Sequence, residues 1–217
     1  MTGMSEFELI AAMRDRWGSL AIDIGDDAAV LRVPRGESLV ASTDSALEGI
    51  HFRLDWLTTR EGAYRAVTAA LSDLAAMAAS PIGVLLAMQL PPARADVLLD
   101  FADGAADAVR AAGTVILGGN LSAGDAIGIT TTVLGAAFAP LRRAGAQAGD
   151  TLYVTGALGG PSAAVRALSG GGTLPDFLRS RFAGPSARIA EARWLSLAGA
   201  TAAIDISDGV AADRGHL

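Results

Sequence analysis

The amino-acid sequence predicts an α/β protein with two parts, and three observations support this fold class. Short apolar runs typical of buried strands alternate with alanine-rich segments of helical periodicity. The chain has 217 residues, of which 51% are hydrophobic and only 18% charged, which is ample material for a packed core. A polar connection over 140–149 interrupts the pattern. We place a domain boundary there, with an N-terminal domain over 1–139 and a smaller α/β domain over 140–217.

The N-terminal domain is predicted to alternate helices with strands. Ser5 is a suitable N-cap for the first helix, and Pro81 is expected to end the second. Gly118, Gly119 and Asn120 are expected to form a turn where a buried strand ends. The predicted elements are, in order, a helix over 6–17, a turn over 33–37, a strand over 39–41, a helix over 61–79, a strand over 82–90, a helix over about 95–112, a strand over 114–117 and a strand over 126–138.

The second domain is predicted to repeat the same alternation. A strand over 151–155 leads into a helix over about 161–168, and a glycine-rich loop follows at 170–172. A helix over 185–197 then precedes an apolar run over 202–206, which we interpret as another strand that ends in acidic residues. The last residues, 215–217, resemble the start of a helix.

The composition excludes several classes of protein. A net charge of -6 and a pI of about 4.8 argue against a broad surface for nucleic acid or anionic lipid. The absence of cysteine excludes disulfides, thiolate metal sites and a cysteine nucleophile. The N-terminus lacks the pattern of a signal peptide, and the most apolar region, 63–90, is interrupted by Arg65, Asp73 and Pro81. We therefore expect no membrane span and a cytoplasmic protein.

Acidic residues recur where apolar runs end, and this is the main functional signal. The first apolar run of this kind is followed by Ser42, Thr43 and Asp44, and each such segment alone could be an ordinary solvated turn. Asp73 differs because its neighbours are small and apolar, so its carboxylate must reach solvent, cap a backbone group or bind a cation. If the strand ends meet at one edge, the carboxylates of Asp27, Asp44, Asp73, Asp205 and Asp208 could together bind divalent cations, which in turn bind phosphate. The sequence contains neither a P-loop nor the protein-kinase signature set.

Six motifs, in order along the chain, resemble those of the thiamine-monophosphate kinase family, which belongs to the wider group named for aminoimidazole-ribonucleotide synthetase. They are GDDAAVL at 25–31, STDSALEGIHF at 42–52, LSDLAAM at 71–77, GGN at 118–120, RAGAQAGDTLYVTGALG at 143–159 and IDISDGVAADRGHL at 204–217. The resemblance implies an enzyme that transfers the γ-phosphoryl of ATP directly onto thiamine monophosphate. It also implies a homodimer, in which the mixed sheets of two N-terminal domains close into a barrel.

The resemblance assigns roles to individual residues. Several Mg²⁺ ions are implied, with ligands at Asp27, Ser42, Thr43, Asp44, Asp73, Asn120, Asp205 and Asp208. ATP contacts are implied at Gly119, Asn120, Arg143 and Ser207, and a contact to the thiamine substrate at His51. Without the family motif, His51 reads as a histidine bonded to backbone, and Arg143 as a solvated charge in a linker.

Three departures from the family pattern leave alternatives open. The family usually has Asp in place of Asn120 and Asn in place of Ala70, and it continues past the equivalent of Leu217, so we expect the second domain to be partial. One alternative is another ATP-using member of the same group, although selenophosphate synthetase commonly needs a cysteine that this chain lacks. The other is a truncated, non-catalytic module for nucleotide binding or dimerisation.

Overall fold

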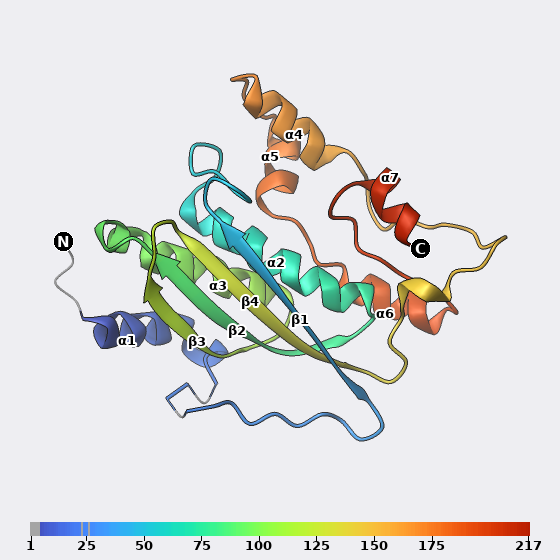
Figure 1. Cartoon of the computed structure of the whole chain (residues 1–217), viewed down its shortest axis with the longest axis horizontal. Coiled ribbons are helices and arrows are strands. Elements are labelled where there is room, and N and C mark those ends of the chain that lie inside the picture. The colour runs from blue at the N-terminus through green and yellow to red at the C-terminus, as the bar shows by residue number, and fades with distance from the viewer. Residues whose placement is uncertain (1–4, 23, 26) are drawn as a thin grey trace.

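The computed structural model describes residues 5–22, 24–25 and 27–217. Asp23 and Asp26 lie outside the described residues, and Asp26 belongs to the GDDAAVL motif at 25–31. Within the described part, an α/β architecture is confirmed: helices pack against one side of a mixed sheet, and further helices follow it in sequence (Figure 1).

The sheet has four strands, and it is open rather than closed. They are β1 (Ser38–Leu47), β2 (Ser80–Leu90), β3 (Ile116–Ala123) and β4 (Gly128–Ala137). The spatial order is β1-β4-β2-β3, with β4 antiparallel to both β1 and β2, and β3 parallel to β2. β1 and β3 are therefore the edge strands of this chain.

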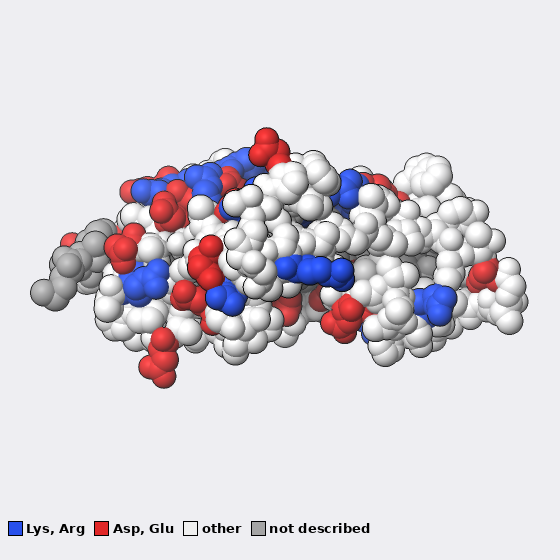
Figure 2. Space-filling model, turned by 90° about the horizontal axis from the view of Figure 1, so that it is seen from above, with Lys and Arg blue, Asp and Glu red and all other residues white. Residues whose placement is uncertain are grey.

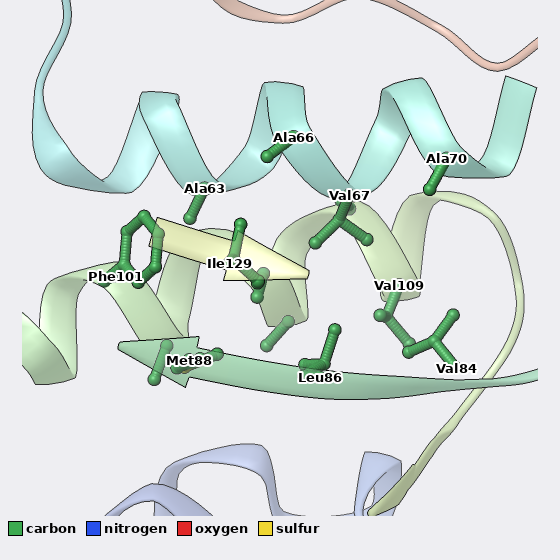
Figure 3. Packing of buried hydrophobic residues seen from close by; sticks show 14 of the residues in the cluster. Ala63, Ala66, Val67, Ala70, Val84, Leu86, Met88, Phe101, Val109 and Ile129 are labelled. Carbon is green, nitrogen blue, oxygen red and sulfur yellow. The ribbon is translucent and has the colours of Figure 1, made fainter. Parts of the chain in front are cut away.

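Two helices cover one face of the sheet. α2 (Thr59–Ala76) and α3 (Leu98–Ala111) lie side by side behind the strands in Figure 1. Figure 3 shows small side chains of α2 pointing at alternate residues of β2, which form the centre of the core. Small residues allow the helix to approach the sheet closely, and the cluster they form is fully buried. The residues of this contact include Ala63, Val67, Ala70, Val84, Leu86 and Met88.

Local sequence explains where the first helices begin. α1 (Glu6–Trp17) starts at Ser5, whose hydroxyl and the carboxylate of Glu8 form a reciprocal capping box. α2 starts in the same way, with Thr58 and Glu61 as the pair. The short 3-10 helices Gly18–Leu20 and Pro92–Val97 follow α1 and precede α3. The indole of Trp17 donates to the carbonyl of Ala102 at 3.0 Å, which fixes α1 against α3.

Three local predictions in the N-terminal part are wrong in detail. Ser42, Thr43 and Asp44 lie inside β1 rather than after it, because β1 pairs with β4 along ten residues regardless of where its apolar run ends. The glycines at 118–119 lie inside β3 rather than in a turn, because β3 pairs with β2. Pro81 lies in β2, and α2 already ends at Ala76, two residues before Ala78 takes a left-handed conformation with φ 53°.

The part after β4 contains helices and no strand within the described residues. Its elements are the 3-10 turn Arg143–Gly145, α4 (Gly160–Ser169), α5 (Asp176–Ala183), α6 (Ile189–Leu197), α7 (Val210–Asp213) and the 3-10 turn Arg214–His216. The strands predicted over 151–155 and 202–206 do not form. An extended segment becomes a strand only when another strand bonds to it, and no described strand lies beside either segment. α5 was not predicted.

The face of the sheet away from the helices is exposed, and we call it the open face. Cross-strand neighbours project on the same side, so the register places Ser45, Thr130, Ala87 and Asn120 in one row across all four strands. The hydroxyls of Ser45 and Thr130 are 2.7 Å apart. In Figure 1 this face is turned toward the viewer, with α2 and α3 behind it.

Candidate functional site

β1 and α2 bring the first two candidate residues together. Successive side chains of a strand point to opposite faces, so Ser42 and Asp44 face α2 while Thr43 faces the open side. The hydroxyl of Ser42 donates to Oδ2 of Asp73 at 2.5 Å, although the two residues are 31 positions apart. This side-chain hydrogen bond is none of the three possibilities stated for Asp73 above: its carboxylate accepts a hydroxyl group from the sheet.

Asp205 reaches the same end of α2 from the far end of the chain. Its Oδ2 accepts the hydroxyl of Ser72 at 3.2 Å across 133 positions of sequence. Burial raises the pKa of Asp205, and the neighbouring negative charge of Asp73 raises it further. Asp73 and Asp205 are therefore close enough to repel, which is the arrangement that a divalent cation relieves.

The oxygen atoms of Asp73, Asp205 and Ser42 suit a hard cation such as Mg²⁺. Carboxylate and hydroxyl oxygens are the ligands that Mg²⁺ prefers, and Asp73, Asp205 and Ser42 supply them from three separate segments. However, in the part of the chain that the structure describes, no three or more His, Cys, Asp or Glu side chains gather closely enough to hold a metal ion. The structure thus brings Asp73 close to Asp205, and the metal cluster expected from the sequence stays a prediction.

The remaining acidic candidates are exposed. Asp44 faces α2, and its Oδ1 accepts the N–H of the next residue, Ser45, at 2.8 Å. Asp27 lies before β1, and Asp208 lies on the loop before α7. Asn120 lies on the open face, as the register with Ala87 requires, so within one chain it is on the opposite side of the sheet from Asp44.

The residues expected to contact ATP or thiamine monophosphate are also dispersed. Gly119 has a structural reason to be glycine, because a Cβ there would lie 1.9 Å from the carbonyl oxygen of Leu86. Nδ1 of His51 accepts the backbone N–H of Leu47 at 3.1 Å, the bond expected of a histidine that holds a turn. Arg143 and Ser207 are exposed.

Two residues that the sequence interpretation did not single out support this site. Ser72 provides the hydroxyl that bonds Asp205. Asp213 is only 3% exposed, and its Oδ2 accepts the backbone N–H groups of Asp208 at 3.2 Å and Gly209 at 3.0 Å. Both residues lie inside the family motifs, LSDLAAM at 71–77 and IDISDGVAADRGHL at 204–217. Their position next to acidic candidates is the feature of the sequence that could have pointed to them.

Charges outside the site are mixed in sign. On the face that Figure 2 shows, arginines alternate with Asp and Glu over one end, and much of the other end is uncharged. Several arginines are paired, for example Arg60 with Asp107 at 2.5 Å and Arg16 with Asp103 at 2.6 Å. Among the described helices, none combines the length and the apolar character that crossing a membrane would require.

Comparison with known proteins identifies the family. Residues 25–137 match the family described as AIR synthase related protein, N-terminal domain. The thiamine-monophosphate kinase of Escherichia coli strain K12 is 36% identical over 225 residues, covering 98% of this chain and 68% of the relative. The chain belongs to the thiamine-monophosphate kinase family.

Solved structures agree with this membership. The crystal structure of thiamine-monophosphate kinase from Stenotrophomonas maltophilia K279a superimposes with a TM-score of 0.83 at 33% identity, covering 98% of this chain and 71% of that one. A further structure, AaThiL complexed with AMPPCP and TMP, has a TM-score of 0.76 at 29% identity and covers 100% and 70%. The fold and the resemblance drawn from the motifs are thus both supported by the comparisons.

Proposed function

We propose that this chain transfers the γ-phosphoryl group of ATP onto the phosphate of thiamine monophosphate, which gives thiamine diphosphate. Membership of the kinase family supports the reaction, and the relative bound to AMPPCP and TMP supports a site that accepts a nucleotide together with the thiamine substrate. One observation in this chain supports the proposal most directly. The carboxylates of Asp73 and Asp205 lie close together, and each accepts a hydrogen bond from a serine hydroxyl.

The roles proposed for the metal ions and for the protein follow from the charges of the substrates. The two phosphate groups repel each other, and bound Mg²⁺ would neutralise their charge and favour the developing transition state. Asp73 and Asp205 would hold the metal with Ser42, and Asp44 would join them from the same face of β1. The acceptor oxygen of thiamine monophosphate is already ionised, so the chain needs no general base, and its main task is to orient the two substrates.

Exposed residues around this centre are proposed to bind the substrates. Arg143 and Ser207 would contact the nucleotide, since a guanidinium and a hydroxyl both bond phosphate oxygens. His51 would contact the thiamine substrate through its Nε2, because its Nδ1 is occupied by a backbone N–H. Asp27 and Asp208, which are exposed, are proposed to join the metal site when the substrates are bound.

A second copy of the chain is proposed to complete the rest of the site. β1 and β3 are edge strands, and a barrel made from two four-stranded sheets would occupy both edges and enclose the open face. Thr43, Gly119 and Asn120 belong to these two strands, so a dimer would bring the remaining metal and ATP positions into an enclosed space. We further propose that 1–139 and 140–217 act as separate domains, since the sheet ends at Ala137.

The direct test is product formation by the purified 217-residue chain. ATP, thiamine monophosphate and Mg²⁺ are incubated with the protein, and thiamine diphosphate is separated by chromatography. We expect product that requires the metal and that disappears in the Asp73→Asn variant. A folded wild-type chain that makes no thiamine diphosphate under saturating substrates and metal would refute the proposed activity.

A second candidate, a nucleotide-binding module without turnover, is favoured by two observations. The expected acids do not gather into a cluster within one chain, and Asn120 stands where the family usually supplies a carboxylate. Such a module would bind AMPPCP with Mg²⁺ in calorimetry but yield no product. Another ATP-using member of the same group would instead consume ATP with a substrate other than thiamine monophosphate.

A further inference from the structure

Ser72 and Asp73 are consecutive on α2, yet they contact different parts of the chain. Adjacent helical residues project about 100° apart, so their side chains leave the helix in different directions. Asp73 accepts a hydrogen bond from Ser42 of the sheet, while Ser72 donates to Asp205 in the irregular segment 201–206. A single turn of α2 therefore joins the sheet to the last part of the chain.

Asp205 needs an external anchor because secondary structure does not fix its segment. Residues 201–206 belong to no helix or strand and pair with no described strand. The carboxylate of Asp205 is half-buried beside that of Asp73, and like charges repel at short range. Without a donor that holds it, an ionised Asp205 would turn away from Asp73. The hydroxyl of Ser72 donates a hydrogen bond to the Asp205 carboxylate and can serve as this donor.

We propose that Ser72 is a positioning residue of the site: its hydroxyl holds the carboxylate of Asp205 beside Asp73, so that one divalent cation can bind both acids. The inference rests on the proposed function, because the cation is the one that phosphoryl transfer would require. Ser72 acts through Asp205 and touches neither substrate. Its role is the placement of a ligand from one part of the chain against a ligand from another.

The test measures Mg²⁺ affinity directly, with Mg²⁺ alone titrated into the full 217-residue chain by calorimetry. Ser72→Ala is expected to bind Mg²⁺ about tenfold more weakly, the lower end of the loss typical when the partner of a metal ligand is removed. Ser72→Thr keeps the hydroxyl and is expected to bind nearly as well as the wild type. Alanine is the better helix former, so the unfolding temperature of Ser72→Ala is not expected to fall.

Ser180→Ala is the matched control. The Ser180 hydroxyl also makes a 3.2 Å hydrogen bond, to the carbonyl of Phe177 on α5, and it lies outside the proposed site. Its loss is expected to leave Mg²⁺ affinity unchanged. A double-mutant cycle adds the decisive comparison: on an Asp205→Asn background, Ser72→Ala should cause no further loss if it acts only through Asp205.

The outcomes separate this inference from the proposed function. Wild-type affinity in Ser72→Ala, or losses that simply add in the double mutant, would overturn the positioning role, as would a wild-type chain that binds no Mg²⁺. A chain that binds Mg²⁺ with the expected Ser72 dependence but forms no thiamine diphosphate would refute the activity alone. Product formation by Ser72→Ala with an unchanged Mg²⁺ requirement would refute the role of Ser72 alone.

Discussion

At the scale of single residues, Asp73 is the point on which the candidate site depends. Its helix neighbours Leu74 and Ala75 are 0% and 5% exposed, so its carboxylate lies at the border of the core. Ser42 donates to one of its oxygens, and the nearby charge of Asp205 opposes its own. Because the charge of Asp73 raises the pKa of Asp205, this pair of acids is more readily explained by function than by stability.

Replacing Asp73 by Asn is therefore expected to separate binding from stability. Mg²⁺-dependent affinity for AMPPCP should fall at least about tenfold, or about 1.4 kcal/mol, because a metal ligand is lost. The unfolding temperature should be equal or higher, because the repulsion of Asp205 is removed while Asn can still accept the Ser42 hydrogen bond. Calorimetry and thermal unfolding measure the two effects. Asp15→Asn, an exposed acid on α1, is the control, and unchanged affinity in Asp73→Asn would argue against a metal ligand.

At the scale of elements, the contact between α2 and α5 connects the two parts of the chain. Arg179 of α5 pairs with Glu61 of α2 at 2.6 Å. The guanidinium of Arg65 donates to the carbonyl of Phe182 and lies 4.6 Å from the centre of its ring. Burial lowers the pKa of Arg65, which is the cost of placing this charge between two helices. Since α2 also carries Ser72 and Asp73, these contacts hold the later helices against the helix that bears the site.

The Glu61 contact predicts a dependence of stability on acid. Burial alone would raise the pKa of Glu61, but hydrogen bonds from the backbone of Thr58 and from Arg179 outweigh it and leave the pKa below its ordinary value of 4.5. A lowered folded-state pKa stabilises the fold above pH 4.5, and this contribution is lost as the pH falls further through the folded-state value.

Urea unfolding at pH 7 and pH 3.5 should therefore show that wild type exceeds Glu61→Gln in stability at pH 7, with the difference shrinking in acid. Gln keeps the capping acceptor but cannot titrate, so the variant isolates the charge. Identical acid dependence in both proteins would contradict the role of Glu61.

These elements also show what the sequence can and cannot determine. Helical periodicity and the cap at Ser5 located α1 at its observed bounds, because a helix is stabilised by its own hydrogen bonds. Periodicity also located α2, although its end, predicted at residue 79, lies at Ala76. The segment 151–155 has the composition of a strand but lacks a described partner, and strand pairing is a property of two segments. The family motifs predicted that Asp73 and Asp205 belong to one site, whereas Ser72 and Asp213 act through contacts of 3.2 Å and 3.0 Å that only the folded chain reveals.

At the scale of the whole molecule, the open face is the largest structural asymmetry. One side of the sheet is covered by α2 and α3, while the row that contains Ala87 and Asn120 is exposed. The proposed dimer would cover this row, and its disruption should therefore be possible with one bulky charge.

Ala87→Arg, at the centre of the open face, is expected to give a monomer in light scattering and to reduce thiamine diphosphate formation. Ala111→Arg adds the same side chain at an exposed position of α3, on the helical side, and is expected to leave the mass unchanged. If wild type and Ala87→Arg have the same mass, the open face is not the dimer contact.

The two sides of β1 face different parts of the molecule. Its even-numbered residues Ser42 and Asp44 face α2 and the proposed cation site, while Thr43 and Ser45 face the side proposed for the second copy. A rigid strand held from one side presents its other side with less freedom, so assembly and metal binding would be thermodynamically linked. The apparent Mg²⁺ affinity should then rise with total protein concentration. A Mg²⁺ titration repeated at several protein dilutions would show whether metal binding and dimerisation are coupled.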